Sequence, residues 1–528
     1  MRLRAEAVVR ALPPALFLAA LLAAPAAATE HGTFILLSGA DTIAVETFHR
    51  GPDGLSGELV FRAQGTRTRF FMTPRADASI SHYEQAGWSL AAAPDAAPSS
   101  HAAIEFQGDS AITEAAPGGS RRLLSAPGAV VFVNPSVTMM EQMVRRARAM
   151  GRDTAKVQVF RVTGGPTIPF TVRRLGADST VLDLGGVEVR LATDAAGAVT
   201  GGRVPSQGLV IRRAAYDERA LATVRPDYSA PAGAPYTAET VRVPTPGGFT
   251  LVGTLTRPKP GKAKVPAVVT ITGSGAEDRD EYLPTVAGYR PFRQIADALA
   301  RRGIAVLRLD DRGYGESGGD FASATTLDFA NDTRAAVAWL RTRTDIAGDR
   351  IALLGHSEGG LIAPMVAADD PALKAIVLMA GPSRNGRRIL EYQNSQVINA
   401  GNPSPATRDS LLRRAMRGAD SVATTQAWMR FFLSYDPIPT AKRVRTPVLI
   451  LQGTTDRQVT ADQAPELEAA FRQGGNKDVT MRRFEDANHL FLDDPIGDPA
   501  GYSKLLHRQV RADVIDTLSD WLVLKLEP

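Results

Sequence analysis

The chain has 528 residues, a formal net charge of +5 and no cysteine. This length exceeds what one hydrophobic core usually organises, so two domains are expected. The lack of cysteine excludes disulfides, thiolate chemistry and cysteine-ligated metals. The small net charge gives no reason to expect nucleic acid as a partner.

The first residues have the three parts of a secretory signal peptide. Several arginines precede an apolar run over residues 15–22, and small residues then follow and end at Ala28. The apolar run is too short to span a bilayer, which favours cleavage of residues 1–28 over retention as an anchor. We therefore expect a periplasmic or secreted protein whose mature chain has no membrane span.

Residues 29–224 alternate apolar and polar side chains in short segments such as "GELVFRAQGTRTRFFMTPR" and "KVQVFRVTGG". Gly, Asp and Pro separate these segments, a pattern typical of an antiparallel sheet, roll or barrel. One helix is expected near residues 137–150. The histidines of this half lack metal-ligand spacing, so it is interpreted as a β-rich accessory domain without a metal site.

A Pro- and Ala-rich stretch over residues 225–239 predicts a linker, and the pattern changes after it. Apolar runs now alternate with helical patterns, which predicts a mostly parallel sheet covered by helices on both faces over residues 240–528. Strands are expected at 265–272, 304–309, 351–354, 375–379 and 448–452, and helices at 292–302 and 327–342.

An insertion over residues 384–442 is longer than an ordinary connection between strands. We interpret it as a helical lid over an apolar pocket, and the alternative is a packing excursion that never touches substrate. Apolar and aromatic side chains recur in it at helical spacing: Leu411, Leu412, Met416, Trp428, Phe431, Phe432 and Tyr435.

The segment "IALLGHSEGGLIAP" places Ser357 in a G-x-S-x-G pattern between a strand-like run and a helical one, the context of a nucleophilic serine on a sharp turn. Such a serine needs a histidine as base. His356 adjoins the serine and should point away from its hydroxyl, and His507 lies in an apparent helix. His489, in the loop "FEDANHLF", is therefore the expected base.

The base needs a carboxylate partner and the reaction needs N–H donors for an oxyanion. Asp456 follows the apolar run 448–452 and gives the chain order Ser357, Asp456, His489. The expected oxyanion donors are the main-chain groups of Glu358 and Ser274, with Gly275 as the competitor of Ser274. A phosphate-binding role for the stretch "TGSGAED" is less favoured, because the stretch lacks the third glycine of a dinucleotide loop and the Gly-Lys-Ser/Thr ending of a P-loop.

Five motifs carry a family resemblance: "GSGAEDRDEY", "RLDDRGYGESGG", "GHSEGGLIAP", "LQGTTDRQV" and "DANHLF". Over residues 241–524 the chain resembles bacterial α/β-hydrolase esterases related to the serine aminopeptidase and prolyl oligopeptidase clans. The resemblance implies an α/β-hydrolase fold with an eight-strand-type sheet, Ser357 as nucleophile, Asp456 as acid, His489 as base and no cofactor. Thr272-Gly273 replaces the His-Gly common in the oxyanion loop of relatives, and Asp311 and Arg312 are expected to brace loops.

Three functions fit these residues. The first is a carboxylesterase acting on a small-molecule ester. The second is an aminopeptidase or acylaminoacyl peptidase with the same triad, which needs a charged group to hold a substrate terminus, and the candidates for that group are Glu358, Glu277, Asp278 and Asp280. The third is a binding protein on an inactive hydrolase scaffold. Neither the natural substrate nor the oligomeric state follows from the sequence.

Overall fold

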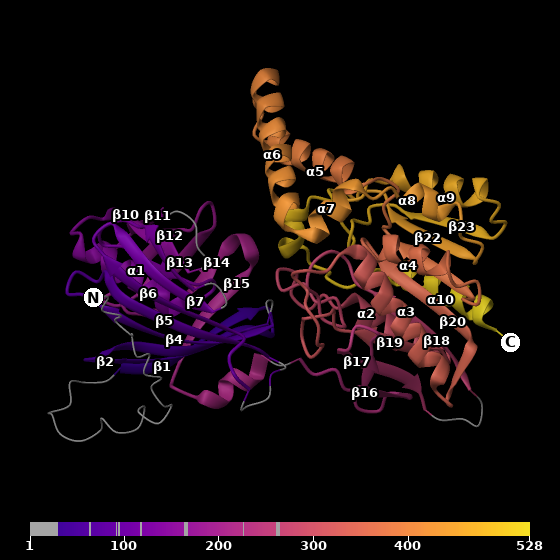
Figure 1. Cartoon of the computed structure of the whole chain (residues 1–528), viewed down its shortest axis with the longest axis horizontal. Coiled ribbons are helices and arrows are strands. Elements are labelled where there is room, and N and C mark those ends of the chain that lie inside the picture. The colour runs from indigo at the N-terminus through magenta and orange to yellow at the C-terminus, as the bar shows by residue number, and fades with distance from the viewer. Residues whose placement is uncertain are drawn as a thin grey trace, which may run out of the picture.

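The computed structural model describes residues 30–527, apart from 63–64, 91, 93–95, 117–118, 163–166, 225 and 260–263. The expected signal peptide, residues 1–28, lies outside this part of the chain. Two separate sheets organise the described residues, one in each half of the sequence, and Figure 1 shows the two halves side by side.

The N-terminal sheet has 15 strands in the order β8-β7-β6-β5-β4-β3-β2-β1-β15-β14-β13-β12-β11-β10-β9. Neighbours are antiparallel except β9 and β10, which run parallel. Alternating burial along β13, where every second residue is buried, explains the two-residue rhythm of the sequence. The strands are β1 (Glu30–Ser38), β2 (Asp41–Gly51), β3 (Gly54–Phe61), β4 (Thr66–Pro74), β5 (Ile80–Ser89), β6 (Ser100–Gln107), β7 (Ser110–Ala116), β8 (Gly119–Leu124), β9 (Val130–Phe132), β10 (Thr154–Arg161), β11 (Ile168–Arg174), β12 (Ser179–Asp183), β13 (Glu188–Thr193), β14 (Val199–Val204) and β15 (Leu209–Ala214).

Helix α1 (Val137–Ala149) packs against the sheet of this half, with most of its residues buried. The Ser136 hydroxyl caps its first turn by accepting from Met139 N–H, and its apolar side chains join the core of the sheet. The Glu46 carboxylate, buried on β2, accepts the N–H groups of Val137 and Thr138 at 2.7 and 3.0 Å. Burial outweighs these bonds and raises the pKa of Glu46 to about 7.

The C-terminal sheet has eight strands in the order β16-β17-β19-β18-β20-β21-β22-β23. β16 and β17 are antiparallel to their neighbours, and the other strands are parallel. The predicted fold class, an α/β domain preceded by a β-rich domain, is confirmed. The strands are β16 (Tyr236–Pro244), β17 (Thr250–Pro258), β18 (Val265–Ile271), β19 (Ala305–Leu309), β20 (Ile346–His356), β21 (Ala375–Met379), β22 (Val448–Gly453) and β23 (Val479–Phe484).

Helices cover both faces of this sheet. α3 (Thr326–Thr342), α4 (Gly359–Ala367) and α9 (Gln463–Gln473) share one core with it. α2 (Pro291–Arg301) and α10 (Ala512–Leu526) share the other. Successive residues of β20 enter opposite cores, Leu353 the first and Leu354 the second, because side chains alternate along a strand. Both faces are apolar, which produces the continuous apolar runs of the sequence.

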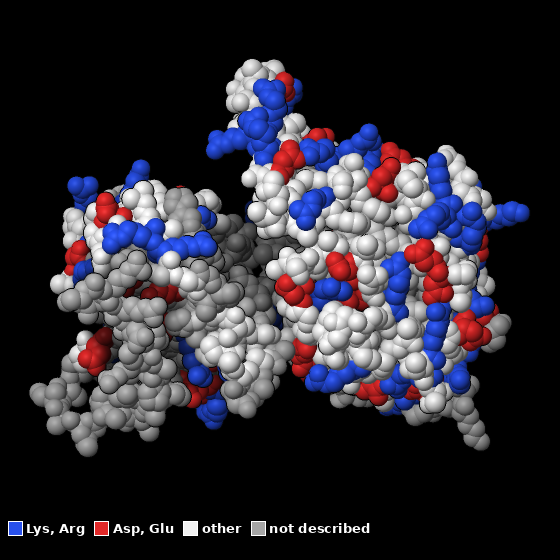
Figure 2. Space-filling model, in the orientation of Figure 1, with Lys and Arg blue, Asp and Glu red and all other residues white. Residues whose placement is uncertain are grey.

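Four helices stand between β21 and β22: α5 (Gly386–Ala400), α6 (Pro405–Thr425), α7 (Ala427–Ser434) and α8 (Pro437–Ala441). Figure 1 shows α6 projecting away from both halves, and Figure 2 shows Lys and Arg side chains along this projection. Of the residues expected in lid helices, Leu411 is exposed whereas Met416 and Phe432 are buried. Among the described helices, none is long and apolar enough to cross a bilayer.

The stretch expected to be a linker, residues 225–239, lies between the 3-10 helix η4 (Glu218–Val224) and β16. Its last residues, from Tyr236, form the beginning of β16. Tyr228, near its start, donates from its hydroxyl to Asp278 of the C-terminal half at 3.1 Å. The stretch is therefore partly anchored to the second domain.

Candidate active site

Ser357 stands on the turn between β20 and α4, with φ of 52°. This left-handed conformation is strained for a residue with a side chain and is typical of functional turns. The turn is fixed by main-chain bonds, because Ser357 N–H donates to Met379 O and Gly360 N–H donates to Ser357 O, each at 2.9 Å. The strand-turn-helix context expected for the serine is present.

The glycines around Ser357 are required by close packing. A Cβ on Gly355 would lie 2.0 Å from Gly359 O, and a Cβ on Gly359 would lie 2.2 Å from Ile271 O. Both distances are far below atomic contact, so glycine at 355 lets the end of β20 pack against the first turn of α4, and glycine at 359 lets that turn pack against β18. The serine is thereby brought to the carboxyl end of the parallel strands.

His489 and Asp456 meet at the same end of the sheet, on the loops after β23 and β22. Both residues are buried, and His489 Nδ1 lies 2.8 Å from Asp456 Oδ2. The other carboxylate oxygen of Asp456 accepts the N–H groups of Gln458 and Val459 at 2.8 and 2.9 Å. These bonds fix the carboxylate, which in turn orients the imidazole.

One cavity of about 270 Å³ receives both Ser357 and His489. It also receives two of the expected oxyanion residues, Ser274 and Glu358. The insertion contributes part of its wall from α5 and α7: Ile389, Leu390, Gln393, Trp428 and Phe432. Asp456 lies behind His489 and does not line this cavity. The structure therefore brings the residues expected from the sequence to one place.

The sheet order, the turn at Ser357 and comparison with known proteins assign this half of the chain. Residues 288–496 match the family described as serine aminopeptidase, S33. Esterase EstD of Thermotoga maritima is 31% identical over 281 residues, which is 52% of this chain and 65% of EstD. The C-terminal half is an α/β-hydrolase domain. The family resemblance inferred from the sequence motifs is confirmed.

Other matches to the α/β-hydrolase domain are more distant. Dipeptidyl aminopeptidase BIII of Pseudoxanthomonas mexicana is 28% identical over 253 residues, which is 46% of this chain and 34% of that protein. The solved structure of the Pyrococcus furiosus esterase Pf2001 aligns with a TM-score of 0.38 and 18% identity, over 50% of this chain and 88% of that one. This chain thus matches only part of the length of these curated relatives.

The loop after β18 lies against the serine of the α/β-hydrolase domain. A Cβ on Gly273 would lie 3.4 Å from Ser357 Cβ. The Gly273 N–H is already bound, because it donates to Glu277 Oε2 at 3.1 Å and to Glu281 Oε1 at 2.9 Å. Any main-chain donor that this loop offers to a bound molecule must therefore come from the residues after Gly273.

The side chain of Glu358 connects the turn at Ser357 to the insertion between β21 and β22. Its Oε1 accepts from Thr326 Oγ1 at 2.6 Å and from Trp428 Nε1 of α7 at 2.8 Å. Burial raises the pKa of Glu358, and these hydrogen bonds oppose the rise. The sequence indicated only a main-chain role for this residue, because nothing local shows which side chains reach it.

A second carboxylate–histidine pair lies beside the first, and sequence analysis missed it. His356 Nδ1 is 2.7 Å from Glu281 Oε1, and His356 Nε2 is 3.0 Å from the main-chain oxygen of His489. Burial disfavours the charged imidazole, but Glu281 and the His489 oxygen outweigh it and raise the pKa of His356. Both ring nitrogens are bound, so neither is left for Ser357.

His507, the third histidine of this half, is exposed and lies outside any helix. The sequence-based expectation of a helix at this residue was wrong, since α10 begins only at Ala512. The reason is a tertiary contact: the side-chain amide of Gln294 binds both the N–H and the C=O of Val510 at 2.9 and 2.7 Å. This pairing holds the chain extended just before α10.

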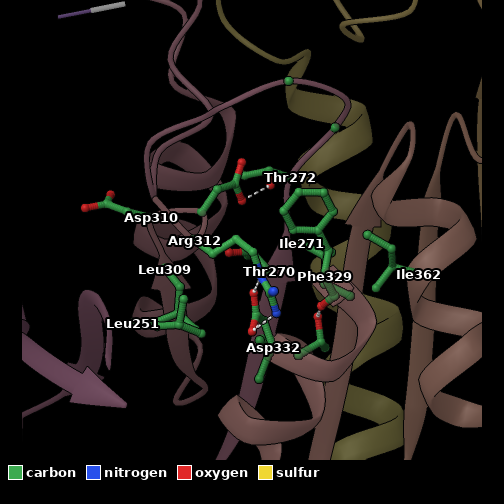
Figure 3. A pocket seen from close by; sticks show the side chains of 15 residues that line it. Leu251, Thr270, Ile271, Thr272, Leu309, Asp310, Arg312, Phe329, Asp332 and Ile362 are labelled. Carbon is green, nitrogen blue, oxygen red and sulfur yellow. Dashed lines mark hydrogen bonds and ion pairs between the residues drawn. The ribbon is translucent and has the colours of Figure 1, made fainter. Parts of the chain in front are cut away.

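Asp311 and Arg312 brace loops beside the site. Asp311 accepts from Thr272 Oγ1 at 2.8 Å and from Glu277 N–H at 2.9 Å. Figure 3 shows Arg312 turned toward Asp332, which it binds at 2.6 and 2.7 Å. Within the described part of the chain, no three His, Asp or Glu side chains are grouped so as to hold a metal ion.

Proposed function

We propose that the protein is a serine esterase that cleaves a carboxylic ester of a small molecule through an acyl-enzyme on Ser357. The observation that carries the proposal is the shared cavity: Ser357, on a strained turn, opens into the same space as His489, whose other nitrogen is paired with Asp456. A serine hydroxyl with a carboxylate-oriented histidine beside it is the arrangement of acyl-transfer enzymes.

Each residue has a distinct role in this proposal. Ser357 Oγ attacks the ester carbonyl while His489 Nε2 accepts its proton, and Asp456 stabilises the imidazolium through Nδ1–H. The proton then passes to the departing alcohol, and a water molecule activated by His489 releases the acid. Glu358 N–H and Ser274 N–H hold the oxyanion, with Gly275 as the alternative to Ser274, because Gly273 N–H is already bound.

The acidic residues near the cavity favour ester over peptide substrates. Asp278 and Asp280 are bound to Arg62 and Arg308, and neither aspartate lines the cavity. Glu277 does line it, but burial, followed by the neighbouring carboxylates, raises its pKa well above the usual value. This shift favours the neutral carboxyl of Glu277, and the neutral form offers no charge to a substrate ammonium group.

Glu358 also lines the cavity, but its Oε1 is already bound to Thr326 and Trp428. An exopeptidase depends on a charged group of this kind to fix the substrate terminus. The similarity to EstD, a protein named as an esterase, supports the same preference.

The competing proposal is an aminopeptidase that uses the same three residues. Its support is the serine aminopeptidase family match and the similarity to a dipeptidyl aminopeptidase. A third possibility, a binding protein on an inactive scaffold, is disfavoured because Ser357, His489 and Asp456 are all present. We further propose export to the periplasm or beyond, which rests on the signal-like residues 1–28 alone.

The deciding experiment compares nitrophenyl esters of increasing acyl length with matched aminoacyl and acylaminoacyl anilides. We expect turnover of the short esters and little turnover of the anilides, and loss of both in Ser357→Ala. Anilide kcat/KM values comparable to the ester values would replace the esterase proposal with the peptidase one. Unchanged activity in Ser357→Ala would contradict the assignment of Ser357 as the nucleophile.

A further inference from the structure

The loop between β18 and α2 has an unusual composition for its position. Five consecutive polar residues, Asp278 to Tyr282, are at most 6% exposed although they belong to no helix or strand. Connecting loops normally lie at the surface, since buried polar groups need partners. This loop also carries Ser274, so the partners that fix it bear on the proposed oxyanion site.

Most of the buried charges in the loop are neutralised from within the α/β-hydrolase domain. The Arg279 guanidinium donates twice to Asp310, at 2.9 and 2.6 Å, and Asp280 is bound by Arg308. Asp278 has no such arginine in its own domain among the described ion pairs. Its counter-charge is Arg62, directly after β3 in the N-terminal domain, whose Nη2 lies 2.7 Å from Asp278 Oδ2.

The N-terminal domain also holds the neighbouring aromatic residue. Tyr282 is buried in the N-terminal hydrophobic core, and the Arg62 guanidinium lies 3.9 Å from the centre of its ring. Further along the loop, Arg290 pairs with Asp41 of the N-terminal domain at 2.7 Å. The loop is therefore fixed from both sides, by one domain through its charges and by the other through Arg62, Asp41 and the core around Tyr282.

A chain of hydrogen bonds connects Asp278 to the proposed oxyanion site. The Oδ1 atom of Asp278 accepts the N–H groups of Asp280 and Tyr282 at 3.0 and 3.1 Å and so closes the turn around Glu281. Glu281 Oε1 accepts Gly273 N–H at 2.9 Å. Gly273 directly precedes Ser274 and lies against Ser357, so the turn at Asp278 sets where the Ser274 N–H points.

We propose that the N-terminal domain is a working part of the active site, because Arg62 acts across the domain interface as a positioning residue for the oxyanion loop. Removing its charge takes away the one ion-pair partner of the buried Asp278 carboxylate among the described residues and leaves Oδ2 with the Tyr228 hydroxyl, which favours rearrangement of the turn. No local sequence pattern indicates more than an accessory role for the N-terminal half, because the two paired residues are 216 positions apart. This inference rests on the proposed function of Ser357.

The test uses the full chain and the variants Arg62→Met, Arg62→Lys and Arg62→Met with Asp278→Asn. Arg67→Met is the matched control, because Arg67 lies on neighbouring β4 and its carboxylate partner is Glu58 of its own domain. Turnover of a nitrophenyl butyrate is measured for each variant. The result is divided by the number of serines that react with a fluorophosphonate, so that misfolded molecules are not counted.

We expect Arg62→Met to lower kcat per reactive serine by at least about tenfold, since loss of one oxyanion donor costs roughly 100- to 1,000-fold and here the donor is displaced, not removed. KM should stay within about threefold, because the acyl pocket is unchanged. The double variant should recover part of the loss, since it removes the unpaired carboxylate. Arg67→Met should match the wild type.

A purely structural role for Arg62 would lower the number of reactive serines and leave kcat per serine unchanged, and that result would overturn the proposal. Arg62→Lys keeps a charge but not the planar contact with Tyr282, and it replaces Arg62→Met in this test if Arg62→Met fails to fold. Its kcat per reactive serine should lie between those of the wild type and Arg62→Met. A wild-type protein with no ester turnover and no reactive serine would instead count against the proposed function, which keeps the two failures distinct.

Discussion

Replacing Asp456 by asparagine should disable the histidine without disturbing its position. The carboxylate has two different sides: Oδ1 accepts two main-chain N–H groups, from Gln458 and Val459, while Oδ2 faces His489 Nδ1 and the Gln452 side-chain amide. An asparagine at this position must keep its oxygen toward the two main-chain donors. Its NH2 group is therefore forced toward His489 Nδ1.

An NH2 group at that place donates to Nδ1 and holds the imidazole proton on Nε2, the nitrogen that accepts the proton of Ser357 in the proposed mechanism. In a serine protease the same change, which produces the wrong tautomer, lowers kcat by about 10⁴-fold. We expect a loss of that order in Asp456→Asn, equivalent to about 5 kcal/mol of transition-state stabilisation. The melting temperature should fall only slightly, because the main-chain bonds to residue 456 are kept and the Gln452 side-chain amide, which loses its bond to this residue, still donates to Gly453 O and Val459 O.

The assay is steady-state hydrolysis of a short-chain nitrophenyl ester, with the melting temperature measured in parallel. Asp493→Asn is the control, since Asp493 is an exposed aspartate four residues beyond His489. It should retain wild-type turnover. A folded Asp456→Asn protein that loses less than about tenfold would refute the assignment of Asp456 and would point to a different orienting acid.

Three further changes test other parts of the structure. Trp428→Ala should shift the preference of the enzyme toward longer acyl esters because it opens the lid wall of the cavity, whereas Trp428→Phe should keep the preference and lose only the bond to Glu358. As the pH rises from about 4.5 to 7, the free energy of unfolding should fall by about 3 kcal/mol, because the folded-state pKa of Glu46 is raised and the folded protein binds the extra proton. Glu46→Gln should flatten this pH dependence, measured by urea titrations. An unchanged slope in the variant would contradict the assignment of the effect to Glu46. Gly359→Ala should destabilise the protein by roughly 1–3 kcal/mol and reduce labelling of Ser357, because the added Cβ would lie 2.2 Å from Ile271 O. A variant with the wild-type melting temperature would show that the turn has room to adjust.

The sequence predicted best those features that a short local pattern determines. The apolar run at 375–379 coincides with β21, and the helix expected at 327–342 begins one residue earlier, at Thr326. Ser357, Asp456 and His489 each follow a strand of the parallel sheet, and the carboxyl ends of such strands meet at one edge. Their convergence on one site could therefore be inferred from loop positions alone.

Features that depend on contacts between distant residues were not accessible in this way. Glu281 and His356 are 75 residues apart, and Arg62 and Asp278 are 216 apart, so only the folded chain shows that they are partners. His507 was misplaced in a helix for the same reason, since the contact of Val510 with Gln294 is not visible in the local pattern. The pairing order of the 15 N-terminal strands likewise follows from long-range register.

The most direct test of the central claim is to trap the acyl-enzyme. The wild-type protein and Ser357→Ala are mixed with a nitrophenyl butyrate, quenched in acid within the first turnover, and analysed by intact-mass and peptide mass spectrometry. We expect one butyryl group per wild-type chain, on the peptide that contains Ser357, and none on the variant. An acyl group on any other residue, or steady ester turnover by Ser357→Ala, would contradict the assignment of Ser357 as the nucleophile.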